Sequence, residues 1–186
     1  MFKKYILLFS FLWTFLFNGC SGDKKEESVN DMVATAEYVL RGIDNKEYVV
    51  KKQGGGFVLS DAKDKIVIFD IFATWCPPCR TTASHLTSLQ QKYKDNLIII
   101  GLTIEDGIEN SKLQEFANTY NAKYAIANSD QNRRLINDIA TGLQVGPKYP
   151  IPLMAMYKDA KLINYYAGAT QEEFIESDIK NALGNK

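Results

Sequence analysis

The chain has 186 residues, of which 46% are hydrophobic and 12% aromatic, which is enough to build one packed domain with additional segments. Its 22 basic and 22 acidic residues give a formal net charge of zero. No basic stripe stands out along the sequence, so nucleic acid is not an expected partner.

The N-terminus has the pattern of an export signal. Lys3 and Lys4 precede an apolar stretch over residues 5–17, which is shorter than the roughly 20 residues that a membrane-spanning helix requires. Gly19 and Cys20 follow, an arrangement that resembles a bacterial lipoprotein signal. In such a signal a small residue precedes the cysteine that becomes lipidated, so we expect a lipid on Cys20.

These features divide the chain into three expected segments. Residues 1–19 form a signal peptide, residues 20–34 a flexible tether, and residues 35–186 the folded domain. Lipidation of Cys20 would leave two other cysteines in the mature chain, which avoids an unpaired thiol in an oxidising compartment. The expected location is therefore the periplasm or cell envelope, with the protein anchored to a membrane by its lipid.

Hydrophobic patterns after the tether predict strands alternating with helices. Residues 66–72 and 97–103 are apolar runs typical of strands buried on both faces, whereas apolar residues at three- and four-residue steps indicate helices. The predicted strands cover residues 37–40, 47–52, 57–59, 66–72, 97–103, 124–127, 153–157 and 162–166, and the predicted helices cover 77–95, 111–120, 132–141 and 171–183. This order favours an α/β fold with a central mixed sheet, helices on both faces and an N-terminal β-hairpin.

The motif that carries chemistry is Cys76-Pro77-Pro78-Cys79, which follows the buried strand 66–72 and begins a predicted helix. Unpaired N–H groups and the positive dipole end of a helix N-terminus favour a thiolate there. Two intervening residues let the second sulfur close a disulfide, so the pair can cycle between dithiol and disulfide. Half a zinc site is the alternative, but the sequence offers no second ligand pair, and we expect neither metal nor cofactor.

The segment 73–79, Ala-Thr-Trp-Cys-Pro-Pro-Cys, resembles exported thiol-disulfide oxidoreductases of the TlpA/ResA/DsbE type, which have a thioredoxin-like fold. The resemblance extends over about residues 35–184. Ile151-Pro152 and the hairpin that follows match the cis-proline hairpin of this family. A loop over residues 143–150 leads to that proline and is expected to border the active site.

The resemblance implies a role for each matching residue. Cys76 is the attacking cysteine and is expected to be exposed, and Cys79 is the resolving cysteine and is expected to be buried. A substrate segment would pair as an extra strand with the backbone beside the cis-proline. The expected substrate-binding residues are Trp75, Pro77, Pro78, Ile151 and Pro152.

Asp70 lies six residues before Cys76 on a buried strand, where cytoplasmic thioredoxins place a buried acid. A buried carboxyl has a raised pKa and can move protons, so Asp70 is a candidate proton acceptor for Cys79; a structural pairing role is the alternative. Thr82 stands where several relatives carry an acid that often accompanies cytochrome c assembly. His85 is expected to be a core or surface residue, because no nucleophile–base pair is implied.

The predicted activity is reduction of disulfides in exported proteins, including the haem-binding cysteine pairs of apocytochrome c. A membrane electron donor of the thiol-reductase type would restore the dithiol, because an oxidising compartment supplies no electrons. A disulfide oxidase or isomerase is the first alternative, and a metal-delivery or assembly protein for a respiratory oxidase is the second. A thiol peroxidase is disfavoured because residues 70–75 lack the proline that precedes a peroxidatic cysteine.

Overall fold

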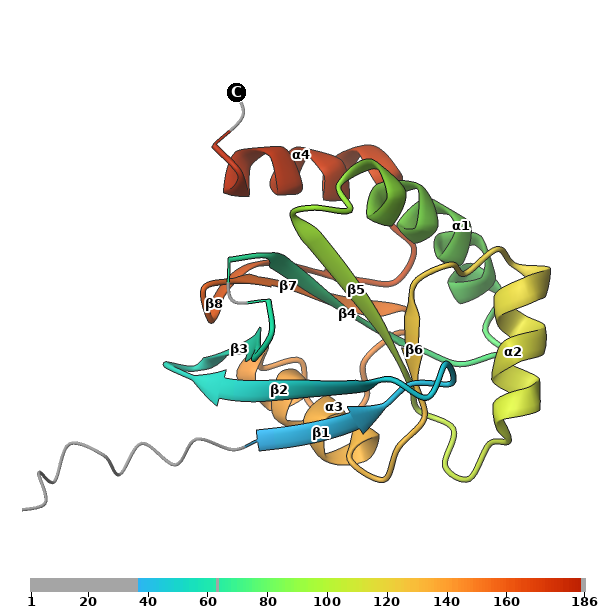
Figure 1. The fold of residues 1–186 in the computed structure, drawn as a ribbon. Helices are drawn as coiled ribbons and strands as arrows, with labels where there is room; N and C mark the ends of the chain where they lie inside the picture. Colours follow the sequence, from blue (N-terminus) through green and yellow to red (C-terminus); the bar gives the residue numbers. More distant parts are fainter. Residues whose placement is uncertain (1–36, 63, 185–186) are drawn as a thin grey trace, which may run out of the picture. The chain divides into compact units, whose positions relative to one another are not determined.

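The structure is a computed structural model that describes residues 37–62 and 64–184 (Figure 1). The predicted signal peptide, the tether and Cys20 lie outside the described residues and stay predictions. Within the described part, no helix is long and apolar enough to cross a membrane.

Strands and helices alternate through most of the described chain, as predicted (Figure 1). The strands are β1 (Glu37–Arg41), β2 (Glu47–Gln53), β3 (Gly56–Leu59), β4 (Ile66–Phe72), β5 (Leu97–Thr103), β6 (Ala125–Ala127), β7 (Leu153–Lys158) and β8 (Lys161–Ala167), and the helices are α1 (Pro77–Lys92), α2 (Asn110–Thr119), α3 (Asn132–Gly142) and α4 (Glu172–Ala182).

The central sheet is mixed and has the strand order β6-β5-β4-β7-β8. Strand β4 pairs in parallel with β5, and β5 pairs in parallel with β6, because helical crossovers connect them. Strand β7 runs antiparallel to both β4 and β8. Strands β7 and β8 form the predicted C-terminal hairpin. This arrangement is the thioredoxin-like α/β fold and confirms the predicted fold class.

The N-terminal extension is larger than the predicted β-hairpin. Strands β1, β2 and β3 form a separate three-stranded antiparallel sheet, in which β3 pairs with β2. Gly54 and Gly55 make the tight turn between β2 and β3 with φ angles of 55° and 93°, a conformation that glycine adopts without a steric penalty. This turn lets the segment 57–59 fold back onto the hairpin, which the strand assignment alone did not reveal.

Alternating side chains of β4 supply two cores, one on each face of the central sheet. Ile68 and Phe72 pack with the helices α1, α2 and α4. Phe69 and Ile71 point the other way and pack with α3 and the three-stranded sheet. Figure 1 shows α1 and α4 on one side of the central sheet, with α3 and β1–β3 on the other. Both faces are therefore covered, as the continuous apolar run of β4 predicted.

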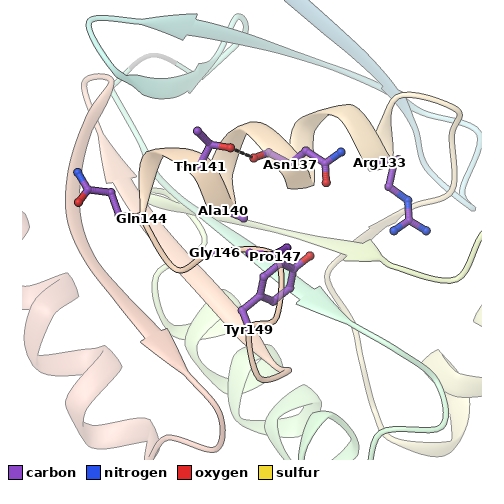
Figure 2. Close-up of a pocket in the computed structure, with 8 residues that line it drawn as sticks. All are labelled: Arg133, Asn137, Ala140, Thr141, Gln144, Gly146, Pro147 and Tyr149. Atoms are coloured by element: carbon purple, nitrogen blue, oxygen red, sulfur yellow. Dashed lines mark hydrogen bonds between the residues drawn. The ribbon is translucent and has the colours of Figure 1, made fainter.

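The connection from α3 to β7 folds back along its own helix (Figure 2). Gln144 and Gly146 adopt φ angles of 57° and 74°, which reverse the chain after the helix end. Residues of the loop, including Tyr149, line a cavity of about 550 Å³ together with the outer side of α3. The loop then delivers Ile151 to the central sheet just before β7 begins.

Candidate active site

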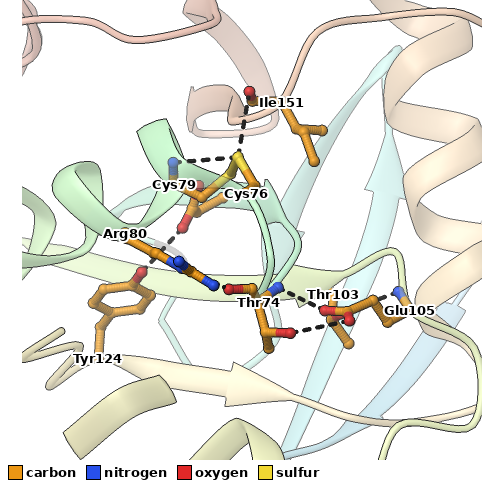
Figure 3. The surroundings of a disulfide bond; sticks show 9 residues. Thr74, Cys76, Cys79, Arg80, Thr103, Glu105, Tyr124 and Ile151 are labelled. Carbon is orange, nitrogen blue, oxygen red and sulfur yellow. Dashed lines mark hydrogen bonds between the residues drawn. A yellow bond between two sulfur atoms is a disulfide. The ribbon is translucent and has the colours of Figure 1, made fainter. Parts of the chain in front are cut away.

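The two cysteines of the motif lie at the start of α1, where the chain leaves β4. Cys76 is the N-cap residue, with extended backbone angles of −81° and 111°, and its Sγ accepts a hydrogen bond from the N–H of Cys79 at 3.2 Å. Pro77 and Pro78 occupy the first helical positions, where the missing N–H groups would have no intrahelical acceptor. A disulfide joins Cys76 and Cys79 (Figure 3).

The structure does not show the predicted difference in exposure between the two cysteines. Cys76 and Cys79 are each 2% exposed in the disulfide form, so the expectation of an exposed first cysteine is wrong for this state. Cys76 is buried because its neighbours shield it from solvent. Its Sγ lies 3.6 Å from the carbonyl oxygen of Ile151 and is bonded to Cys79. Trp75 is 59% exposed beside them, which excludes plain core packing for this side chain.

The Ile151–Pro152 peptide bond is cis, which is the geometry that the resemblance implied. Its position explains the contact with the cysteine pair, because the Ile151 carbonyl faces the Cys76 sulfur (Figure 3). The Pro152 carbonyl is already used, since it accepts the N–H of Gly168 at 2.8 Å. A disulfide sulfur has no hydrogen to donate, whereas the reduced Cys76 thiol can donate to the Ile151 carbonyl.

Asp70 is buried in β4, as predicted, with 2% of its surface exposed. Its Oδ2 accepts a hydrogen bond from the hydroxyl of Tyr124 at 3.0 Å, and its Oδ1 has no partner among the described residues. Burial raises the pKa of Asp70 to about 7, and the bond from Tyr124 acts in the opposite direction. Because Asp70 alternates with Phe69 along β4, it points to the face that α1 and the cysteine pair cover.

Tyr124 reaches Asp70 across the neighbouring strand. In the sheet register Asp70 lies opposite Gly101 of β5, and Gly101 lies opposite Ile126 of β6. A Cβ at Gly101 would lie 3.2 Å from Cε2 of Tyr124 and 3.1 Å from Cε1 of Phe72. The glycine therefore leaves the space in which the tyrosine ring extends toward the acid.

A second acid, Glu105, holds the segment that precedes the cysteines. Its Oε2 accepts the N–H of Thr74 at 2.6 Å, and its Oε1 accepts the Thr74 hydroxyl at 3.0 Å. The Nε–H of Arg80 donates to the Thr74 carbonyl at 2.9 Å, so both polar ends of Thr74 are bonded (Figure 3). Thr74 is thereby held from two sides, by the loop after β5 and by α1.

Sequence reasoning missed both Tyr124 and Glu105. A usable signal existed for Glu105, because it follows a predicted strand closely, as Thr74 does. Phe72 pairs with Thr103 at the carboxyl ends of two parallel strands, so residues just beyond these ends meet at one edge of the sheet. No comparable signal existed for Tyr124, since its contact depends on a missing side chain at Gly101.

Two further residues discussed in the sequence analysis do not take part in the hydrogen bonds given above for the cysteine sulfurs. Thr82 is buried in α1, and His85 is half-buried on the same helix, with an Nδ1 atom that has no partner in the part of the chain described. Residues 37–62 and 64–184 contain no group of three or more histidine, cysteine or acidic side chains placed to hold a metal ion.

Comparison with known proteins agrees with this geometry. Residues 43–153 match the AhpC/TSA family. The chain belongs to this family. It is 26% identical over 181 residues to the thiol-disulfide oxidoreductase ResA of Bacillus thuringiensis (strain Al Hakam), which covers 96% of this chain and 97% of that protein. It is 35% identical over 69 residues to the thioredoxin-like protein YneN of Bacillus subtilis (strain 168), which covers 37% and 41%.

Solved structures show the same fold. A thiol:disulfide interchange protein of Chlorobium tepidum TLS aligns with a TM-score of 0.64 and 19% identity, over 81% of this chain and 95% of that one. The exposed lipoprotein thioredoxin Etrx1 of Streptococcus pneumoniae strain TIGR4 aligns with a TM-score of 0.56 and 18% identity, over 78% and 99%. The protein is a thioredoxin-like thiol-disulfide oxidoreductase of the ResA/DsbE type with a Cys-x-x-Cys redox centre.

Proposed function

We propose that this oxidoreductase works as a reductant of disulfides in exported proteins at the cell envelope, with apocytochrome c cysteine pairs among its substrates. The observation that supports this best is the cysteine pair at a helix N-terminus, 3.6 Å from a backbone carbonyl that precedes a cis-proline. This arrangement combines a sulfur that a helix start can hold as a thiolate with backbone that an extended peptide can pair against.

The first step is attack by the Cys76 thiolate on one sulfur of a substrate disulfide. A bond forms between Cys76 and that sulfur, the substrate S–S bond breaks, and the second substrate sulfur leaves as a thiolate that takes a proton from water. The N–H of Cys79 lies 3.2 Å from the Cys76 sulfur and stabilises its negative charge before the attack. Cys76 is the better attacking residue because its sulfur is the one at the helix N-cap.

The second step releases reduced substrate. The Cys79 thiol loses its proton and its thiolate attacks the Cys76 sulfur of the mixed disulfide. The Cys76–Cys79 bond forms, the bond between Cys76 and the substrate sulfur breaks, and that sulfur leaves as a thiolate, so the substrate has gained two electrons over the cycle. Asp70 is the proposed acceptor of the Cys79 proton, because a carboxyl with a pKa of about 7 can hold a proton at neutral pH. Tyr124 would keep the carboxyl oriented through its hydroxyl.

The substrate would lie against Trp75, Pro77, Pro78 and the Ile151–Pro152 segment. Trp75 and Pro77 are exposed beside the sulfurs, and the Ile151 carbonyl offers a hydrogen-bond acceptor to an extended peptide. A membrane electron donor of the thiol-reductase type would return two electrons to the Cys76–Cys79 disulfide after each cycle.

The proposed location rests on the N-terminal sequence and on one structural relative that is an exposed lipoprotein. Acylation at Cys20 would hold the domain at a membrane through the segment 20–34. Replacing Cys20 by Ala should release the protein from membranes of its native cell or block its processing. Unchanged fractionation and unchanged mass of the mature form would contradict the lipid anchor.

A redox titration of the Cys76–Cys79 pair against glutathione tests the direction of the reaction. A reductant should have a potential more negative than about −220 mV, whereas a strong oxidase would have one nearer to about −120 mV. A potential in the oxidising range would favour the oxidase alternative. Identification of substrates then follows from the Cys79→Ser variant, which should trap mixed disulfides with them, while Cys76→Ser should trap none.

A further inference from the structure

A cleft opens directly beside the exposed Trp75. It has a volume of about 240 Å³ and lies between the segment 74–75, the start of α1 and the outer side of α2. Phe116 and Tyr120 supply an aromatic wall, with ring centroids 5.3 Å apart, and Arg80 and Lys112 supply the positive charge. The cleft therefore combines an apolar wall with cationic groups.

Arg80 is held in place by a backbone carbonyl and an aromatic ring. Its Nε–H donates to the Thr74 carbonyl at 2.9 Å, and its guanidinium carbon lies 5.2 Å from the centroid of the Tyr120 ring. Within the described residues, no ion pair includes Arg80. A guanidinium has five N–H donors in a fixed fork, so an ordered Arg80 keeps donors for a ligand.

The charges of the cleft do not cancel. Glu115 is its one acidic side chain, and that carboxylate forms an ion pair with Lys112 at 3.3 Å. Arg80 therefore has no ion-pair partner among the residues that line the cleft, whose wall also contains aromatic side chains. A carboxylate is the group whose planar geometry fits this fork, and the aromatic wall suits the apolar part of the same side chain.

The cleft is also close to the reacting sulfurs along the chain. Trp75 immediately precedes Cys76, and Arg80 immediately follows Cys79. Trp75 and Arg80 therefore flank the cysteine pair along the chain and line the cleft. We propose that this cleft binds an Asp or Glu side chain next to the substrate cysteine, with Arg80 as the recognising group. This inference rests on the proposed function, since it names the polypeptide that the cysteine pair reduces.

Three disulfide-closed peptides test the proposal. They are identical except for Glu, Gln or Lys beside each cysteine, and the measured quantity is the second-order rate constant for their reduction by the reduced protein. At low ionic strength the Glu peptide should react about fivefold faster than the Gln peptide, and the Lys peptide should be slowest. The preference should fall as salt is raised, because the charges are partly exposed to solvent.

The Arg80→Gln variant should lose the preference for Glu over Gln. The ratio of the two rates carries the test, because any displacement of Thr74 would slow both peptides together. Arg134 offers a matched control, since it also stacks on a tyrosine, with its guanidinium carbon 4.4 Å from the Tyr38 centroid, and also donates to a backbone carbonyl, that of Glu37. Arg134→Gln should leave the ratio unchanged.

Two failures are distinguishable. If the wild-type protein reduces the Glu and Gln peptides at equal rates at low salt, the cleft proposal is wrong while disulfide reduction stands. If it reduces none of the peptides and not the neutral disulfide 4,4′-dithiodipyridine either, the proposed function itself fails. A preference for Glu that persists in Arg80→Gln would also overturn the assignment of Arg80.

Discussion

The two faces of the central sheet are built for different purposes, and adjacent residues of β4 show the contrast. Phe69 points to the face of α3 and the three-stranded sheet, where its ring centroid lies 6.1 Å from those of Phe57 and Tyr157. Asp70 points to the opposite face, where it is buried and accepts a hydrogen bond from Tyr124. One face is an aromatic core, and the other contains an ionisable pair within the core that surrounds the cysteines.

The two faces contribute differently to the free energy of unfolding. Burying aromatic rings removes apolar surface from water and stabilises the fold at every pH. Burying a carboxyl whose Oδ1 has no hydrogen-bond partner in the described part of the chain costs free energy, and this cost grows as the group ionises. A substitution in the aromatic core should therefore lower the unfolding free energy and leave disulfide exchange unchanged. A substitution of Asp70 should slow exchange and remove the loss of stability that ionisation of the acid causes.

The largest effect should come from the cysteine that starts α1. Cys76→Ser removes the attacking sulfur, so disulfide exchange should fall to the background rate without protein. The reduced wild-type protein and the variant should unfold at similar denaturant concentrations, since the two side chains are similar in size. Stopped-flow exchange with a model disulfide and urea unfolding measure the two quantities. Residual exchange in Cys76→Ser at the rate of the wild type would assign the attack to Cys79.

On the opposite face, Phe57→Ala should destabilise the fold without touching the chemistry. The side chain is 1% exposed and its ring contacts three other aromatic rings, so the variant should lose about 3–5 kcal/mol of unfolding free energy. Val39→Ala in the same small sheet should change it by less than about 0.5 kcal/mol, because Val39 is 43% exposed. A slower exchange rate in folded Phe57→Ala would show that the two faces are coupled.

The contrast between the faces was only partly predictable. The apolar runs and helical periodicities located the strands and helices, because these patterns reflect which side chains are buried. Helix α1 ends earlier than predicted, because Tyr93 caps it and turns the chain toward β5. The role of the segment 57–59 was harder to see, since its partner strand is set by the turn at Gly54 and Gly55. This third strand places Phe57 against three other aromatic rings, which makes the core on the α3 face aromatic.

Within the site, prediction succeeded where one residue carries the signal and failed where two must meet. Asp70 was identifiable because an acid inside an apolar run is conspicuous in a sequence. Its partner Tyr124 lies 54 residues later, and the clamp between Thr74 and Glu105 spans 31 residues. The second pair could have been inferred from two parallel strands that end at one edge of the sheet, whereas the first depends on which strands are neighbours and on the missing side chain at Gly101.

The pH dependence of stability should identify the cost of Asp70. Its pKa is about 7 in the folded protein, above the ordinary value of 3.8 for an aspartate, so between these pH values the folded state binds one more proton than the unfolded state. The unfolding free energy should therefore fall as pH rises through this window, by an amount on the order of 4 kcal/mol. Asp70→Asn should lack this fall in urea unfolding at pH 4 to 8.

The same variant tests the proposed proton transfer. If Asp70 accepts the Cys79 proton, Asp70→Asn should slow resolution of the mixed disulfide while leaving its formation unchanged. Stopped-flow exchange separates the two steps. Unchanged resolution together with the loss of the pH dependence would make Asp70 a buried acid without a catalytic role.

The smallest effect concerns the hydroxyl of Tyr124. Tyr124→Phe removes the hydroxyl that donates to the Asp70 carboxylate, which should cost about 1–2 kcal/mol at a pH where the acid is ionised. Because this bond lowers the pKa of Asp70, its loss should raise that pKa further, and the pH-dependent fall in stability should extend to higher pH. Tyr93→Phe is the matched control, since the Tyr93 hydroxyl donates to the carboxylate of Glu176 at 2.7 Å, away from Asp70. If Tyr124→Phe and Tyr93→Phe keep the same pH profile as the wild type, the hydroxyl has no influence on the titration of Asp70, and the contrast between the two faces would rest on burial of the acid alone.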